Sequence, residues 1–298
     1  MTRPPVPIIP TCTLPGVLTM LGPTGPVRPL LLDSPHSGTD YPADFDAAVD
    51  RDTLLDAVDT AVDELFGAGP ELGAALLKAH FPRTYIDPNR AADDLDARIL
   101  DGCWPGPLSP TEKTRRGNGL IRRTIGDDDR ALYSRRLGVE EVQERICRYH
   151  APYHRALGEA QDRLMERFGA VYHLNCHSMG SRSREDMTRR PDIVLGDRDG
   201  TTCEAEFTVL AAEVLGGLGY QVRTNHIFKG VELVRAFSAP GAGRHCLQIE
   251  INKDLYIDEA TRRLRPDFAS VQADLAQLID RLAAFAEERA VEAGRDVA

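Results

Sequence analysis

Two histidines follow apolar runs of the sequence at places where a metal ion could be bound. Residues 171–180 form an apolar run that becomes polar around His177, and residues 29–34 form another that is followed by His36. Such runs predict short buried strands. In open α/β sheets, ligands bind outside the carboxyl ends of the strands. The two imidazoles are therefore a plausible start of a zinc site.

The acidic segment 50–66 offers a carboxylate for the same site. Its apolar residues recur at helical spacing with aspartates on another face, a pattern that by itself is typical of a solvated helix. Residues 60–63 can also form a capping box that starts a helix at Thr60. In that case Asp59 lies in the preceding loop, where its carboxylate could turn toward a metal.

Residues 82–90 follow a predicted strand and carry two arginines and an asparagine. Arg83, Asn89 and Arg90 could hold a substrate carboxylate, because a guanidinium binds a carboxylate with two parallel hydrogen bonds. The alternative is an exposed loop with ordinary salt bridges. Further arginines lie in the irregular segment 105–136, which either attracts an anionic substrate or is only a solvated loop.

Glu250 is a second carboxylate near the end of a predicted strand, and the alternation of residues places it opposite the more apolar face. Two neutral imidazoles and one carboxylate would leave a fourth zinc position for water, whose pKa the metal lowers to about 7. Glu250 could then take the proton from that water and deliver it to a departing nitrogen. The chemistry that such a set predicts is hydrolysis of an amide.

The elements that must position these residues alternate between strands and helices. The apolar runs and periodic segments predict strands at 30–34, 74–81, 171–177, 191–197, 220–223 and 244–251, and helices at 139–168, 205–215 and 267–292. The long helix should be broken or bent near Pro152. This alternation predicts one α/β domain over residues 1–298 with a mixed, mainly parallel central sheet flanked by helices. Residues 1–28 should be an irregular N-terminal segment with one edge strand.

Composition limits the class of protein. With 42% apolar and 28% charged residues in 298, the chain is typical of a globular protein. Its net charge of −10 argues against binding to nucleic acid or to anionic membranes, because both require basic surface. The sequence shows neither a signal peptide nor an apolar span, so we expect a cytoplasmic monomer or homo-oligomer that binds a small molecule. Six scattered cysteines favour reduced thiols.

The motifs together resemble the N-formylglutamate amidohydrolases, also called N-formylglutamate deformylases. The resemblance rests on six segments in the order of that family, at residues 34–42, 59–65, 83–90, 175–179, 225–230 and 248–252. This family is similar to zinc carboxypeptidases and aspartoacylases, which implies a zinc-carboxypeptidase-like, phosphorylase/hydrolase-like fold. The activity that the resemblance implies is hydrolysis of the amide of N-formyl-L-glutamate to L-glutamate and formate, in histidine degradation, with Zn2+ as cofactor.

The resemblance also implies roles for individual residues. Asn89 and Arg90 would hold the substrate carboxylate with Arg83 beside them, and Glu250 would be the catalytic carboxylate. His226 belongs to a motif of the family in a loop that we expect to face the site, so it would contact the substrate.

The metal ligands would be the two histidines that follow the apolar runs, together with one carboxylate. Zinc carboxypeptidases and aspartoacylases take two ligands from a His-x-x-Glu motif, but Thr39 stands three residues after His36. The carboxylate ligand is therefore Asp59, Asp40 or Asp63. We favour Asp59, because it opens the capping-box segment and matches an acidic position of the family.

Two other functions stay open on the sequence alone. One is hydrolysis of another N-acyl acidic amino acid, and the other is a non-catalytic member that binds an amino acid or a metal on the same scaffold. Glu250 favours an enzyme, because a binding protein needs no group that carries a proton.

Overall fold

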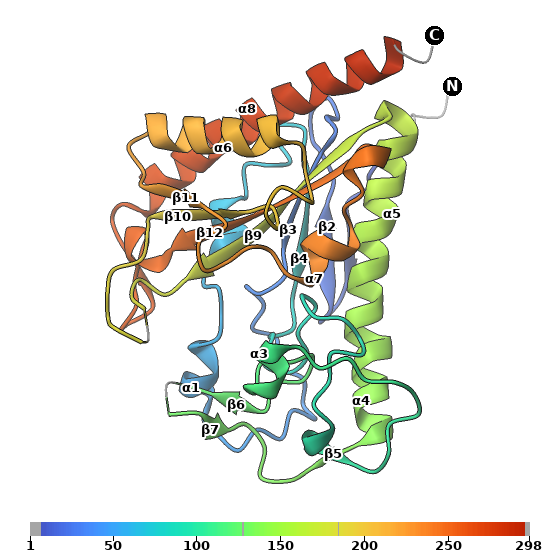
Figure 1. Cartoon of the computed structure of the whole chain (residues 1–298), viewed down its shortest axis with the longest axis vertical. Helices are drawn as coiled ribbons and strands as arrows, with labels where there is room; N and C mark the ends of the chain where they lie inside the picture. Colours follow the sequence, from blue (N-terminus) through green and yellow to red (C-terminus); the bar gives the residue numbers. More distant parts are fainter. Residues whose placement is uncertain (1–6, 127, 184, 296–298) are drawn as a thin grey trace.

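A mixed sheet forms the centre of the computed structural model, which describes residues 7–126, 128–183 and 185–295 (Figure 1). In spatial order its eight strands within these ranges are β1 (Cys12–Leu14), β2 (Leu18–Leu21), β4 (Ala75–Ala79), β3 (Leu30–Ser34), β9 (Val171–Met179), β12 (Arg244–Asn252), β10 (Ile193–Gly196) and β11 (Val222–Thr224). The central strands β4, β3, β9 and β12 are parallel, whereas β2 and β10 run antiparallel to their central neighbours. The predicted mixed, mainly parallel sheet is confirmed.

The N-terminal segment is more regular than the sequence suggests. Instead of one edge strand it contributes two strands, since β1 pairs with β2 and β2 pairs in turn with β4. Leu18 and Met20 are buried, and their burial explains why this proline-rich segment joins the sheet. Residues 1–6 of the predicted segment lie outside the described residues.

Helices cover both faces of the sheet (Figure 1). α5 (Ala151–Phe168) packs on one face, and α2 (Val62–Leu65), α6 (Ala205–Gly217) and α8 (Phe268–Arg295) pack on the other. Successive strand residues point to opposite faces. Leu31 and Leu77 accordingly lie in the core with α5, whereas Leu32 and Leu76 lie in the core with α6 and α8.

The long helix predicted over residues 139–168 is interrupted just before Pro152, as expected. α4 (Val139–Arg145) leads into a π-helical turn at Ile146–His150, and α5 starts directly after it with the proline in its first turn. A proline has no backbone N–H and crowds the preceding turn, so the regular hydrogen-bond pattern cannot continue through it.

The acidic segment that could have been one helix forms two short ones. α1 (Arg51–Leu55) ends well before α2, and Asp59 lies in the loop between them. The capping box expected at Thr60 does not form, because Ala61 precedes α2 in the left-handed conformation (φ 57°) and no side chain caps the helix. The Asp59 N–H donates instead to the carbonyl of His36 (3.1 Å), which ties two predicted ligands together.

Short elements complete the described chain. They are the 3-10 turns Ala97–Ile99, Pro240–Ala242 and Lys253–Leu255, the helices α3 (Glu112–Arg115) and α7 (Glu232–Ala236), and the strands β5 (Leu100–Asp101), β6 (Thr124–Ile125), β7 (Arg130–Ala131), β8 (Leu137–Gly138), β13 (Ile257–Asp258) and β14 (Arg263–Leu264). Figure 1 shows α1, α3 and β5 to β7 grouped at the end of the molecule remote from α6 and α8. Within the described ranges, no helix has the length and apolar character needed to cross a membrane.

Candidate metal centre and substrate cavity

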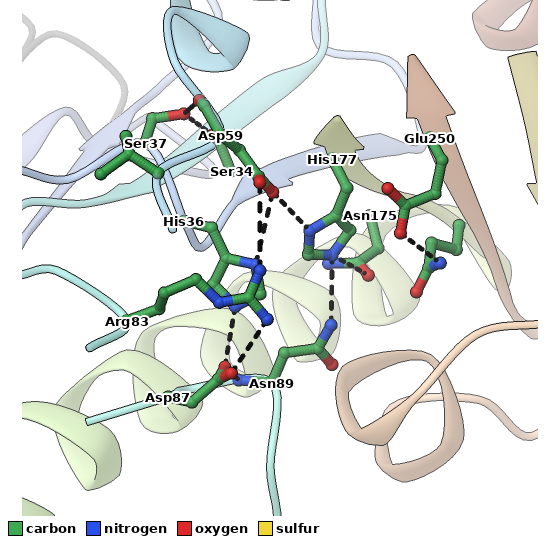
Figure 2. A network of polar contacts seen from close by, with 12 residues as sticks. Ser34, His36, Ser37, Asp59, Arg83, Asp87, Asn89, Asn175, His177 and Glu250 are labelled. Carbon is green, nitrogen blue, oxygen red and sulfur yellow. Dashed lines mark hydrogen bonds and ion pairs between the residues drawn. The ribbon is translucent and has the colours of Figure 1, made fainter. Parts of the chain in front are cut away.

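His36, Asp59 and His177 meet at the carboxyl ends of β3 and β9 (Figure 2). The Nδ1 atoms of His36 and His177 lie 3.4 and 3.1 Å from Oδ2 of Asp59. One potential ligand atom from each of the three residues lies within 4.8 Å of the others, and all three side chains are buried. Two imidazoles and one carboxylate that converge in this way match the nitrogen and oxygen ligands of a zinc site.

The Nδ1 atom of His36 is buried and makes no hydrogen bond. An unpaired buried polar atom lowers the stability of a protein by about 1–3 kcal/mol, so we expect this nitrogen to have a partner. On the other side of the ring, Nε2 donates to Oδ1 of Asp87 (2.7 Å), which leaves the lone pair on Nδ1 facing Asp59. A carboxylate behind a histidine is the usual arrangement at metal sites. The residues present therefore fit a bound metal ion.

His177 is oriented from its far side in the same manner. The amide nitrogen of Asn175 donates to Asp33 (2.8 Å), so the amide oxygen faces His177 and accepts a hydrogen bond from its Nε2 (2.8 Å). The Nδ1 atom then carries the lone pair and points toward Asp59. Burial lowers the pKa of His177, which favours the neutral ring that binds metals.

Asp33 is the centre of a buried polar network behind the site. Its carboxylate accepts hydrogen bonds from the Tyr153 hydroxyl (2.8 Å), Nε2 of His173 (2.6 Å) and Asn175 (2.8 Å). Burial alone would lower the pKa of His173, but Cys246 and the Asp33 carboxylate raise it to about 10. His173 and Asp33 therefore form a buried ion pair near neutral pH, and this pair holds the Asn175 amide in place.

The two alternative carboxylate ligands lie elsewhere. Asp40 is exposed, with Nδ1 of His80 at 3.9 Å, and Asp63 accepts a hydrogen bond from Lys78 (3.1 Å). Of the three carboxylates that the sequence leaves open, the structure brings only Asp59 to the histidines.

Glu250 lies beside His177 on the neighbouring strand (Figure 2). β9 and β12 pair in parallel with these two residues directly opposite each other, so their side chains leave the sheet on the same face. Burial and the nearby Asp59 carboxylate raise the pKa of Glu250 well above its usual range. Gln248 donates a hydrogen bond to Oε1 of Glu250 (3.0 Å). A carboxyl group with a raised pKa at such a position is suited to exchange protons.

Asn89 and Arg90, the predicted carboxylate clamp, both border the cavity. The Asn89 amide nitrogen lies 3.1 Å from Nε2 of His177, and its amide oxygen accepts a hydrogen bond from the Leu233 N–H (2.9 Å). Arg90 is buried and forms no ion pair or side-chain hydrogen bond with any described residue, and its Nε atom is without an acceptor. Its guanidinium is therefore available to an anion from outside the chain.

Asp87 is a candidate functional residue that sequence reasoning missed. Its carboxylate accepts hydrogen bonds from His36 (2.7 Å), Arg83 (3.0 Å) and the Asn89 N–H (2.9 Å). Arg83, predicted to contact substrate, is thus paired with Asp87 and also lies 3.9 Å from Asp59. Its main contacts are with carboxylates of the protein. The only sequence signal for Asp87 is its place just before the Asn-Arg pair.

His226 does not line the cavity. Its side chain is exposed, and Ile227 and Phe228 line the cavity instead. Asn225 and Ile227 both adopt positive φ angles (54° and 67°), and the Asn225 amide donates to Asp197 (2.6 Å). This fixed turn leaves His226 outside the cavity lining, although its loop does reach the site.

The cavity in front of these residues has a volume of about 480 Å³, and seven cationic residues outnumber four acidic ones in its lining. Its cationic residues are Arg83, Arg90, Lys113, Arg116, Arg122, Arg190 and Lys253. Three of them come from the irregular segment 105–136, which the sequence left open between an anion-attracting and a merely solvated loop. Because the chain as a whole has a net charge of −10, this local excess of positive charge favours anionic ligands.

Comparisons with known proteins identify the family of this chain. Residues 28–257 match the family described as N-formylglutamate amidohydrolase. The N-formylglutamate deformylase of Pseudomonas aeruginosa is 33% identical over 270 residues, which cover 88% of this chain and 95% of that protein. Its counterpart from Pseudomonas putida is 29% identical over 271 residues, with 88% and 94% covered.

Solved structures show the same fold. The crystal structure of N-formylglutamate amidohydrolase from Ralstonia eutropha JMP134 has a TM-score of 0.88 and 47% identity, with 92% of this chain and 99% of that chain covered. The gene product Atu2144 from Agrobacterium tumefaciens has a TM-score of 0.62 and 18% identity, with 86% and 91% covered, and this likeness concerns the fold alone.

Proposed function

The chain belongs to the N-formylglutamate amidohydrolase family, and we propose that it hydrolyses the amide of N-formyl-L-glutamate to L-glutamate and formate. The observation that carries the proposal is the buried set His36, Asp59 and His177 with Glu250 beside it. The cationic cavity in front of this set suits a substrate with carboxylates. The names of the relatives support the formyl group and the glutamate.

We propose that the enzyme is metal-dependent and that its metal is zinc. His36, Asp59 and His177 would hold the ion, and the unpaired Nδ1 atom of His36 supports this assignment. A zinc ion bound there supplies Lewis acidity, which lowers the pKa of a coordinated water to about 7 and polarises a carbonyl group.

Glu250 is the catalytic acid and base in this proposal. As the water oxygen bonds to the formyl carbon, Glu250 accepts a proton from the water. When the C–N bond breaks, the same carboxyl group gives that proton to the departing nitrogen, so that formate and the free amine of glutamate result. The raised pKa of Glu250 supports this role, because the residue must hold the proton between the two steps.

Substrate recognition falls to Asn89 and Arg90 in this proposal. Arg90 can bind a carboxylate with two parallel hydrogen bonds, since no described residue occupies its guanidinium. Asn89 lies next to His177, so a carboxylate held by the pair would lie close to the reacting amide. Arg83 acts indirectly, because it fixes the carboxylates of Asp87 and Asp59.

We further propose that residues 1–298 act as one cytoplasmic catalytic domain and that the reaction serves histidine degradation. The acidic composition supports an enzyme that binds neither nucleic acid nor membranes.

The test is metal analysis of the purified protein together with formate release from N-formylated Glu, Asp, Gln and Met. We expect one zinc per chain and the highest kcat/KM with formyl-glutamate. A higher kcat/KM with a longer acyl group on glutamate or aspartate would favour the alternative of another N-acyl acidic amino acid hydrolase. Bound zinc without turnover of any of these compounds would favour a binding protein.

A further inference from the structure

Two guanidinium groups at the cavity have no partner in the part of the chain that the structure describes. Arg90 and Arg122 both line the cavity, and neither forms an ion pair or a side-chain hydrogen bond with a described residue. The Nε atom of each is buried without an acceptor. Burying a charged group without a counter-charge is unfavourable. The presence of two such groups in one cavity therefore indicates that the cavity binds an anionic ligand.

Except for Lys113, the other arginines and lysines of the wall have a partner among the described residues. Arg83 is paired with Asp87 (3.0 Å), and Arg116 is paired with Glu112 (3.0 Å). Arg190 donates to the Gly180 carbonyl (3.0 Å), and Lys253 donates to the Val58 carbonyl (2.7 Å). Apart from Arg90 and Arg122, only Lys113 among the lining cations lacks a hydrogen bond or ion pair to a described residue, and its side chain is exposed.

The backbone around Arg122 is fixed. The N–H of Leu120 donates to the Asp94 carbonyl (2.8 Å), and the N–H of Arg123 donates to the Gly117 carbonyl (2.8 Å). Leu120 and Ile121 are buried in the core, so the residue that follows them is held firmly at the wall. Burial and the positive charge of Arg83 lower the pKa of Arg122 to about 9, which still leaves the guanidinium charged at neutral pH.

If the proposed function is correct, the substrate carries two carboxylates. One is bonded to the carbon that bears the formamide nitrogen, and the other is at the end of the side chain. Asn89 contacts the metal ligand His177, so the Asn89 and Arg90 clamp lies close to the reacting amide and suits the nearer carboxylate. One clamp cannot neutralise both charges.

We propose that Arg122 binds the side-chain carboxylate of the substrate and so determines the preference for acidic N-formyl amino acids. Lys113, which faces the same cavity, adds a second positive charge to this subsite. The inference rests on the proposed function and deepens it, because it assigns the residue that distinguishes a glutamate side chain from its neutral isostere.

The test compares Arg122→Gln with the unaltered enzyme on formyl-glutamate and formyl-glutamine. A hydrogen-bonded charge pair contributes enough binding energy that kcat/KM for formyl-glutamate should fall about 10–100-fold. The value for formyl-glutamine should change less than about threefold, because its side chain has no charge for Arg122 to bind. Equal losses with the two substrates would overturn the proposal.

Arg115→Gln is the matched control, because Arg115 is exposed on α3, lies outside the cavity and carries the same charge. It should leave both kcat/KM values unchanged. Arg122→Lys keeps the charge but loses the planar fork, so it should show a smaller loss that is again confined to formyl-glutamate. This variant decides the question if Arg122→Gln does not fold, since equal losses with both substrates would again contradict the proposal.

The experiments also distinguish an error in the proposed reaction from an error in the Arg122 assignment. If the unaltered enzyme releases no formate from formyl-glutamate, the proposed reaction is wrong, and the Arg122 subsite is then decided by calorimetry with glutarate. Glutarate binding that weakens about 10–100-fold in Arg122→Gln and is unchanged in Arg115→Gln would support the subsite. Equal binding to all three proteins, or no binding to the unaltered one, would overturn it.

Discussion

Replacing Asp87 with asparagine tests whether the carboxylate behind His36 organises the proposed metal site. Asp87 is buried and accepts hydrogen bonds from His36 (2.7 Å), Arg83 (3.0 Å) and the Asn89 N–H (2.9 Å). Asparagine keeps the shape of the side chain but has no charge and only one acceptor oxygen. The His36 ring would lose the charged acceptor that holds its proton on Nε2. Arg83 would keep only its longer contact to Asp59 (3.9 Å).

These contacts determine how much metal affinity and stability the Asp87→Asn protein should lose. Loss of a hydrogen-bonded group behind a metal ligand typically lowers metal affinity about 10–100-fold, or about 1.4–2.8 kcal/mol. Removal of one partner from a buried ion pair typically costs about 3–5 kcal/mol of stability. Because Arg83 retains Asp59 as a neighbour, we expect the lower end of that range, about 3 kcal/mol, for Asp87→Asn.

Zinc affinity is measured by competition with a chelator, and the free energy of unfolding by urea titration of the metal-free protein. Asp63→Asn is the control, since Asp63 also pairs with a cation, Lys78, but does not belong to the set formed by Asp59 and the two histidines. The control should keep its zinc affinity and most of its stability. An Asp87→Asn protein that is less stable but binds zinc as tightly as the unaltered chain would refute the role of Asp87 behind the ligand.

The remaining predictions concern the ligands, the clamp and the buried network. His177→Ala and Asp59→Asn should each lose zinc and activity while the protein stays folded, whereas Asp40→Asn should keep both; stoichiometric zinc in His177→Ala would contradict the ligand set. Arg90→Ala should raise the activation free energy that kcat/KM reports for formyl-glutamate by about 2–4 kcal/mol, with zinc retained. Lysine at this position should restore kcat/KM only in part. His173→Asn should cost about 3–5 kcal/mol in urea unfolding, because it breaks a buried ion pair. Since the pKa of His173 is raised from 6.5 to about 10, this difference should be full below pH 6.5 and shrink as the pH rises through 10, and a pH-independent difference would contradict it.

The sequence predicts the centre of the fold well, because its strands are apolar runs that end in polar residues. β3, β9 and β12 lie where these runs are, and both histidines stand at the expected strand ends. Alternation within β12 also predicts the face of Glu250 correctly. The sequence cannot show that Glu250 lies opposite His177, because the register between β9 and β12 depends on strands that are about seventy residues apart.

The errors have local physical causes. The capping box at Thr60 fails because Ala61 adopts a left-handed conformation, which the sequence does not signal at an alanine. The motif around His226 correctly brings its loop to the cavity, but two neighbouring positive φ angles turn the histidine outward. The sequence does not identify Asp87, because most aspartates in loops are solvated. Only the folded chain shows that this carboxylate accepts a hydrogen bond from His36.

The most direct test of the proposed chemistry is Glu250→Gln, with formate release and zinc content measured on the same protein. Glutamine keeps the shape of the side chain but cannot accept the proton of the attacking water. We expect kcat to fall about 10²–10⁴-fold while the zinc content and the affinity for formyl-glutamate change little. Loss of zinc would show that Glu250 is a metal ligand, and a fall of only two- or threefold would show that another group carries the proton. Either of these two results would contradict the account of the site.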